Sequence, residues 1–64
     1  MDHMYSGNLD LADRFYENGD YGTAEAEYRA CKIKTEKYNP KHTQRIRYCE
    51  EMIKKCERQR NRAE

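Results

Sequence analysis

Apolar side chains recur at helical spacing in three segments of the chain, and the first segment runs from Tyr5 to Asn18. If residues are placed about 100° apart around a helix axis, its apolar positions occupy an arc of roughly 160°. These positions are Met4, Tyr5, Leu9, Leu11, Ala12, Phe15 and Tyr16. Such an arc is wider than one neighbouring helix requires, so we expect this helix to pack against two others.

The second segment runs from Tyr21 to about Tyr38 and follows a break at Asn18-Gly19-Asp20. Gly19 can adopt a positive φ at the end of the first helix, and Asp20 can cap the start of the second. One apolar strip of this helix contains Tyr21, Ala24, Tyr28, Cys31, Thr35 and Tyr38. A second, smaller strip contains Ala26, Ala30 and Ile33, which predicts contacts on two sides of the helix.

The third segment begins after Asn39-Pro40, the clearest boundary in the chain. Proline suits the first position of a helix and asparagine suits its cap, so we expect a helix from Pro40 to about Arg60. Its apolar stripe consists of Ile46, Cys49, Met52, Ile53 and Cys56. No segment shows the alternation of a strand, and the connections are short. The sequence therefore predicts an all-α fold, an antiparallel helical hairpin plus a third helix.

The 64 residues suffice for one small domain with a thin core, since 36% are hydrophobic and 39% are charged. We expect residues 5–60 to form this domain, residues 1–4 to be an appended leader or a disordered segment, and residues 61–64 to fray. Residues 1–31 hold seven acids and two arginines, a charge of −5, whereas residues 32–64 hold eleven Lys and Arg and five Glu, a charge of +6. On the third helix the cations gather opposite the apolar stripe, at Arg47, Lys54, Lys55, Arg58 and Arg62.

The segment from Leu11 to Cys31 resembles a tetratricopeptide repeat (TPR). The matching positions are Leu11, Ala12, Phe15, Gly19, Asp20, Tyr21, Ala24, Tyr28 and Cys31. That family places a small residue and an aromatic on its first helix, a Gly-Asp-Tyr-like turn, and Ala and aromatic positions on its second helix. The resemblance covers one repeat, about residues 5–38, and implies that residues 39–60 form the helix that ends such an array. Cys31 stands where the family usually has alanine, and Pro40 lies later than its usual turn proline.

The TPR resemblance implies a protein-interaction module that docks a peptide or helix between its first and third helices. The groove would present Leu9, Asp13, Tyr16, Glu17, Gln44 and Tyr48. Tyr16 and Tyr48 lie at the edges of apolar stripes, where an amphipathic ring suits binding. Some family members bind acidic tails through a Lys and an Asn at positions that correspond to Leu9 and Asp13, so that clamp is absent here. We therefore expect a basic or amphipathic protein partner.

Two alternatives to this interpretation are open. The pattern Ile46-Arg47-x-Cys49-x-x-Met52-Ile53-x-x-Cys56-Glu57 is similar to the third helix of the MIT domain (microtubule interacting and trafficking). In that family helices two and three line a groove for short peptides, but the span from Tyr21 to Cys49 is about two turns shorter here. The other alternative is binding of nucleic acid or anionic lipid by the basic face of the third helix. It is disfavoured because aromatic residues do not alternate with the cations and the chain is nearly neutral.

The residue types that could carry chemistry are poorly placed for it. His42, Cys49 and Cys56 lie seven residues apart, so neighbouring pairs on a helix are about 10 Å apart and cannot share one metal ion unless a third element intervenes. We expect these cysteines and Cys31 to be small buried hydrophobes, and we expect neither a metal nor a cofactor. Three short helices offer no deep pocket that would tune a catalytic group, so we do not expect an enzyme.

The cysteines also bear on the compartment of the chain. Three cysteines without tight pair spacing indicate reduced thiols and an intracellular, cytoplasmic protein. No apolar run approaches about 18 residues, so we expect no membrane span. A solitary repeat lacks the stacked neighbours that supply much of the core. We therefore expect the chain either to belong to a longer protein or to self-associate as a homo-oligomer.

Overall fold

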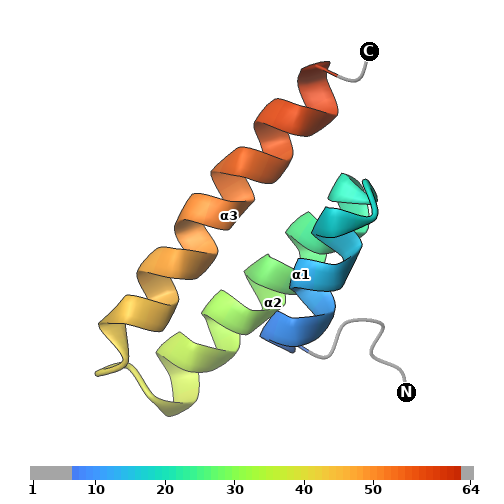
Figure 1. Cartoon of the computed structure of the whole chain (residues 1–64). Coiled ribbons are helices and arrows are strands. Elements are labelled where there is room, and N and C mark those ends of the chain that lie inside the picture. The colour runs from blue at the N-terminus through green and yellow to red at the C-terminus, as the bar shows by residue number, and fades with distance from the viewer. Residues whose placement is uncertain (1–6, 63–64) are drawn as a thin grey trace.

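The computed structural model describes residues 7–62, which form three α-helices. They are α1 (Leu9–Glu17), α2 (Tyr21–Tyr38) and α3 (Thr43–Arg62). Figure 1 shows α2 lying alongside both α1 and α3, and α2 makes the main contacts with each of them. Within residues 7–62 there is no strand, and the predicted all-α hairpin with a third helix is confirmed. The expected leader at residues 1–4 and the last two residues of the expected frayed tail lie outside the described residues.

Helix α1 begins at Leu9. The expectation of a helix from Tyr5 is therefore wrong at Gly7 and Asn8, which are not helical, and Tyr5 itself lies outside the described residues. Gly7 has a φ of +73°, which a helix does not allow. Asn8 has an extended backbone and caps the helix. Its side-chain Oδ1 accepts hydrogen bonds from the backbone N–H groups of Asp10 (2.9 Å) and Leu11 (3.4 Å). Gly7 and the capping Asn8 together fix the start of the helix at Leu9. The apolar periodicity predicted an earlier start because it takes no account of capping residues.

The turn between α1 and α2 is as predicted. Gly19 has a φ of +85°. Its N–H donates to the Tyr16 carbonyl (3.1 Å), and the Asp20 N–H donates to the Phe15 carbonyl (2.9 Å). This pair of bonds is the Schellman motif, which satisfies carbonyls at the end of a helix. The side chain of Asp20 accepts from the Thr23 N–H (3.4 Å) and caps α2, whose bounds agree with the prediction.

The connection between α2 and α3 differs from the prediction. Asn39 was expected to cap the start of the third helix, but it caps the end of α2, where its N–H donates to the Thr35 carbonyl (2.8 Å). Pro40 therefore lies in the connection and not at the first helical position. Helix α3 begins at Thr43 and continues to Arg62, two residues beyond the expected end near Arg60.

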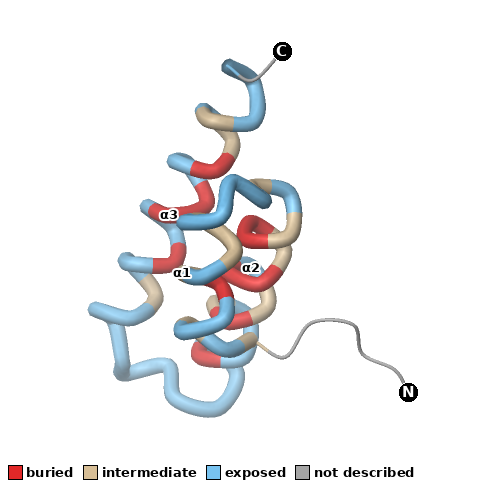
Figure 2. The backbone as a smooth tube through the Cα atoms, turned by 45° about the vertical axis from the view of Figure 1, so that its right-hand side comes forward, coloured by how far each residue is buried: buried red, intermediate tan, exposed pale blue. Residues whose placement is uncertain are grey.

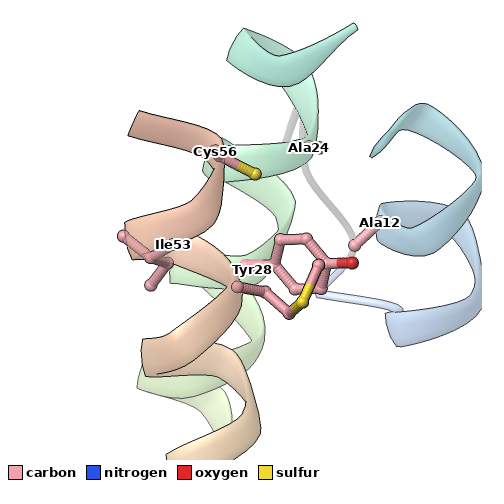
Figure 3. Packing of buried hydrophobic residues seen from close by; sticks show 6 residues of the cluster. Ala12, Ala24, Tyr28, Ile53 and Cys56 are labelled. Atoms are coloured by element: carbon pink, nitrogen blue, oxygen red, sulfur yellow. The ribbon is translucent and has the colours of Figure 1, made fainter. Parts of the chain in front are cut away.

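The core lies where the three helices face one another, as the buried segments in Figure 2 show. Ala12 of α1 and Ala24 of α2 have no exposed surface and belong to one core cluster, so small residues occupy the contact between these two helices. Figure 3 shows the ring of Tyr28 extending from α2 towards Ala12, with Ile53 and Cys56 contributed by α3. Half-buried side chains surround this cluster, namely Leu9, Phe15, Tyr16 and Tyr21.

Tyr38 is an exception to the predicted core strip of α2, because 72% of its surface is exposed. The segment that leads into α1 reaches α2 at Cys31 and Lys34, where a Cβ on Gly7 would come within 3.3 Å of both residues. Helix α1 therefore runs beside the first part of α2 and leaves its last turn uncovered. In this position the ring of Tyr38 lies 5.4 Å from the Lys37 ammonium.

Candidate functional site

The structure brings together only some of the residues expected to line a groove between α1 and α3. Asp13 and Tyr48 meet, because the Tyr48 hydroxyl donates a hydrogen bond to Asp13 Oδ1 (2.8 Å). Leu9 and Tyr16 pack against the core cluster and are half-buried. Glu17 and Gln44 are exposed.

Glu17 and Gln44 lie at opposite ends of the space between α1 and α3. Both α1 and α3 run antiparallel to α2 and are therefore parallel to each other (Figure 1). Glu17 is the last residue of α1, whereas Gln44 is in the first turn of α3. A ligand that contacted both residues would have to extend along the whole of α1.

The carboxylate of Asp13 is already engaged within the fold. It accepts one hydrogen bond from the hydroxyl of Tyr28 and another from that of Tyr48. The two tyrosine rings meet edge to face, with centroids 6.1 Å apart. Burial, and then the hydrogen bond to Asp13, raise the pKa of Tyr28 and the pKa of Tyr48 above the usual value of 10.0. This cluster joins all three helices, and it leaves Asp13 with less capacity for a ligand.

A second candidate surface lies between α2 and α3. It contains a hollow of about 490 Å³, and all of its lining residues belong to these two helices. They are Arg29, Lys32, Ile33, Glu50, Ile53, Lys54 and Glu57, which we call the α2/α3 groove. Ile53 is buried at 9% exposure, whereas Ile33 is 63% exposed, so an aliphatic side chain stands largely in solvent next to the hollow.

Apart from Lys54 on α3, the charges of the α2/α3 groove are sorted by helix. Helix α2 supplies the cations Arg29 and Lys32, and α3 supplies the carboxylates Glu57 and Glu50. Two ion pairs join the helices, from Arg29 Nη2 to Glu57 Oε2 (3.0 Å) and from Lys32 Nζ to Glu50 Oε2 (3.8 Å). The exposed fractions of these four side chains lie between 30% and 53%, so each of them also meets solvent.

A buried carboxylate secures the end of this groove. Glu25 of α2 is only 7% exposed, and its Oε1 accepts a hydrogen bond from Arg60 Nη1 of α3 (2.7 Å). Its Oε2 accepts from Arg29 Nη2 (2.8 Å) and from Arg29 Nε (3.2 Å). The hydrogen bond to Glu25 raises the pKa of Arg29, which keeps the guanidinium charged. A buried carboxylate requires such partners. Because Arg60 belongs to α3 and Glu25 to α2, the network links the two walls at this end of the groove.

The basic face of α3 is solvated. Its five predicted members, Arg47, Lys54, Lys55, Arg58 and Arg62, are all exposed. The ion pairs found among residues 7–62 involve other cations, namely Arg29, Lys32 and Arg60.

The cysteines belong to the core, as predicted from their positions. Cys31, Cys49 and Cys56 are free thiols and all three are buried. Burial, followed by a hydrogen bond with Cys31, raises the pKa of Cys49 to about 12. Burial, followed by the charge of Glu25, raises the pKa of Cys56 to about 11. These two thiols are therefore protonated at neutral pH, which suits packing and not nucleophilic attack.

Sequence reasoning found part of the α2/α3 groove but did not include it in the candidate site. The apolar strip of Ala26, Ala30 and Ile33 was recognised, and it was the available signal for Ile33. Glu50 and Glu57 were not assigned to a binding site, because exposed glutamates are common on any helix. Only the contact between α2 and α3 places them opposite cations.

Comparison of the chain with protein-family models, with curated proteins and with solved structures gave no match. Within residues 7–62, no group of three or more His, Cys, Asp or Glu side chains is arranged to hold a metal ion. Over the same range, no helix combines the length and the apolar character that crossing a membrane requires.

Proposed function

We propose that the chain is a protein-interaction module whose α2/α3 groove binds an amphipathic helix of a partner chain. The observation that carries this proposal is the 63% exposure of Ile33 beside a hollow in which Ile53 is buried. A helix in a groove typically contributes apolar residues at intervals of three and four, which fill such hollows. Burial of the exposed 63% of Ile33 by a partner would contribute about 1–2 kcal/mol, since full burial of an isoleucine contributes about 1.5–3 kcal/mol.

The rim of the groove indicates what the partner helix carries. Cations line the α2 wall, and on the α3 wall the carboxylates Glu50 and Glu57 outnumber the one cation, Lys54. A helix with acidic side chains on one flank and mainly basic side chains on the opposite flank would complement both walls. This fits the amphipathic partner that the sequence suggested. A groove formed by the second and third helices is also the arrangement that the MIT-like resemblance implies, whereas the TPR resemblance implies the surface between α1 and α3.

Two observations make the space between α1 and α3 the weaker candidate. The carboxylate of Asp13 is occupied by two tyrosine hydroxyls, so a ligand would have to replace bonds that hold the fold together. The apolar members Leu9 and Tyr16 are directed into the core cluster and offer less surface than Ile33.

Selection from a displayed library of helical peptides would test the proposal. We expect selected peptides to be amphipathic and to lose at least about tenfold in affinity for the Ile33→Glu variant, which corresponds to about 1.4 kcal/mol. The matched control is Tyr38→Glu, which replaces another exposed apolar residue of α2 outside the groove. Peptides that tolerate Ile33→Glu but lose affinity for a Tyr16→Ala variant would move the site to the surface between α1 and α3.

A further inference from the structure

We propose that the α2/α3 groove packs against the same groove of a second copy of this chain, so that the module forms a symmetric dimer. In this dimer a two-fold axis runs parallel to α2 and α3 and lies between the two grooves. Each α2 then packs over the α3 of the other copy, and four helices enclose the two hollows. This inference rests on the proposed function, because it names the partner of the same groove.

The charges of the groove favour this axis. Arg29 lies within side-chain reach of Glu57, and Lys32 lies within side-chain reach of Glu50, because each pair forms an ion pair across the groove. Rotation about an axis parallel to the helices keeps every residue at its level while it exchanges the two helices. Arg29 of one copy therefore meets Glu57 of the other, and Lys32 meets Glu50, on both sides of the interface.

The other face-to-face arrangement is disfavoured by the same charges. If the two-fold axis crossed the helices at a right angle, α2 would pack on α2, and α3 would pack on α3. The cations Arg29 and Lys32 of both copies would then share one side, and the carboxylates of both copies would share the other. Like charges placed opposite each other in an interface are repulsive, so the parallel axis is selected.

Each of the four charged side chains can take a second partner. Arg29, Glu57 and Glu50 are 53%, 42% and 50% exposed, and Lys32 is 30% exposed. Their intramolecular pairs therefore need not break when the second copy docks. Lys54 is the cation on the α3 wall, and because it is exposed, its flexible chain can carry the ammonium to the rim.

The apolar part of the surface is self-complementary as well. Ile33 of each copy would turn into the space above Ile53, so the dimer buries a side chain that is 63% exposed in the single chain. Ala26 and Ala30 lie on the same side of α2 as Ile33 and are half-buried, and their short side chains let a facing helix approach closely. The face consists of only two helices, so the interface is small and the association should depend on concentration.

Sedimentation equilibrium of the full chain over a wide concentration range tests the dimer. We expect the mass to rise from the 7.8 kDa of a single chain towards twice that value. The Ile33→Glu variant should stay near the monomer mass, whereas the Tyr38→Glu control should follow the original chain. An original chain that keeps the monomer mass up to the highest concentration overturns the inference.

A charge exchange distinguishes contacts between copies from contacts within one chain. Lys32→Glu places two acidic residues opposite each other across the interface, and Glu50→Lys places two basic residues there, so each variant alone should dimerise at least about tenfold more weakly. In a mixture of the two variants every intermolecular pair has opposite charges, although the pair within each chain remains repulsive. The mixture should therefore associate more tightly than either variant alone, and a mixture that does not would overturn the inference.

The two proposals fail in distinguishable ways. If the original chain is monomeric but library peptides bind and are lost with Ile33→Glu, the partner is another protein and only the dimer is excluded. If the chain is monomeric and no peptide depends on Ile33, the groove has no binding role and both proposals fall.

Discussion

At the scale of single residues, Asp13 links all three helices, although its position on the polar face of α1 suggests only contact with solvent. Its carboxylate accepts hydrogen bonds from Tyr28 on α2 and from Tyr48 on α3. Because α1 has only nine residues, it depends on such contacts for its place on the hairpin.

Tyr48→Phe tests this link, because it removes the hydroxyl and keeps the ring against Tyr28. We expect the free energy of unfolding to fall by about 1 kcal/mol, the usual contribution of one hydrogen bond, as measured by urea unfolding followed by circular dichroism. The control is Tyr38→Phe, since the ring of Tyr38 is 72% exposed and should not respond. Equal stability of both variants and the original chain would mean that the Tyr48 hydroxyl does not hold α1.

At the scale of elements, the turn between α1 and α2 depends on one backbone conformation. Gly19 has a φ of +85°, and a Cβ at this position would have no atom within 4 Å. Glycine is therefore favoured here by the backbone conformation and not by a lack of space for a side chain. Gly19→Ala should lower the free energy of unfolding by about 1–2 kcal/mol, because a side chain disfavours the left-handed region.

Gly22 supplies a matched control of opposite sign. It is a glycine inside α2, and an added Cβ there would also find open space. Gly22→Ala should therefore raise the free energy of unfolding by up to about 0.5–1 kcal/mol, because alanine favours a helix. Thermal unfolding of both variants would check the pair, and a shift in the same direction for both would contradict the role given to Gly19.

The helices were predictable from the sequence where local signals determine them, and less so where two signals compete. The bounds of α2 follow from Gly19-Asp20 at one end and from Asn39-Pro40 at the other. At that second boundary, Asn39 could have capped either helix. Its N–H completes the last turn of α2, so α3 starts later than the position of Pro40 suggested. The sequence does not decide such a competition, because both uses of the asparagine are locally favourable.

The candidate surface was less predictable than the helices, because it depends on how helices pair. The sequence indicates Ile33 as part of a second apolar strip. The ion pairs of Glu50 and Glu57 with α2 could not be predicted, because they form only when α3 packs beside α2. Glu25 shows the same limit: its partner Arg60 is 35 residues away, and no local pattern links them. Periodicity gives the faces of helices, whereas the pairing of charges requires the tertiary structure.

At the scale of the whole molecule, the core consists of small and moderately polar groups. Its buried members include two alanines, one tyrosine and three thiols, together with Met52 and Ile53. Such a core contributes less apolar area per residue than one of leucine and phenylalanine, so titration of its members has a larger relative effect on stability.

This composition leads us to expect a loss of stability at alkaline pH. Burial raises the pKa of Cys49 to about 12 and the pKa of Cys56 to about 11, from an ordinary value of 9.0. Between these values the unfolded chain holds fewer protons than the folded one, so the free energy of unfolding falls as the pH rises. Each thiol contributes a slope of up to about 1.4 kcal/mol per pH unit. The contribution is complete below about pH 9 and is lost as the pH approaches 11 to 12.

Urea unfolding under reducing conditions, at several pH values from 7 to about 11, would measure this decline. Ionisation of Tyr28 and of Cys56 acts in the same direction, because burial also raises the pKa of each of these groups. The Cys49→Ala variant separates the thiol from these groups: it should be less stable at pH 7 but should lose stability less steeply above pH 9. If the free energy of unfolding falls in parallel with pH for the variant and the original chain, Cys49 ionises as readily in the folded core as in the unfolded chain. The packing of α2 against α3 would then be more open to water than the structure indicates.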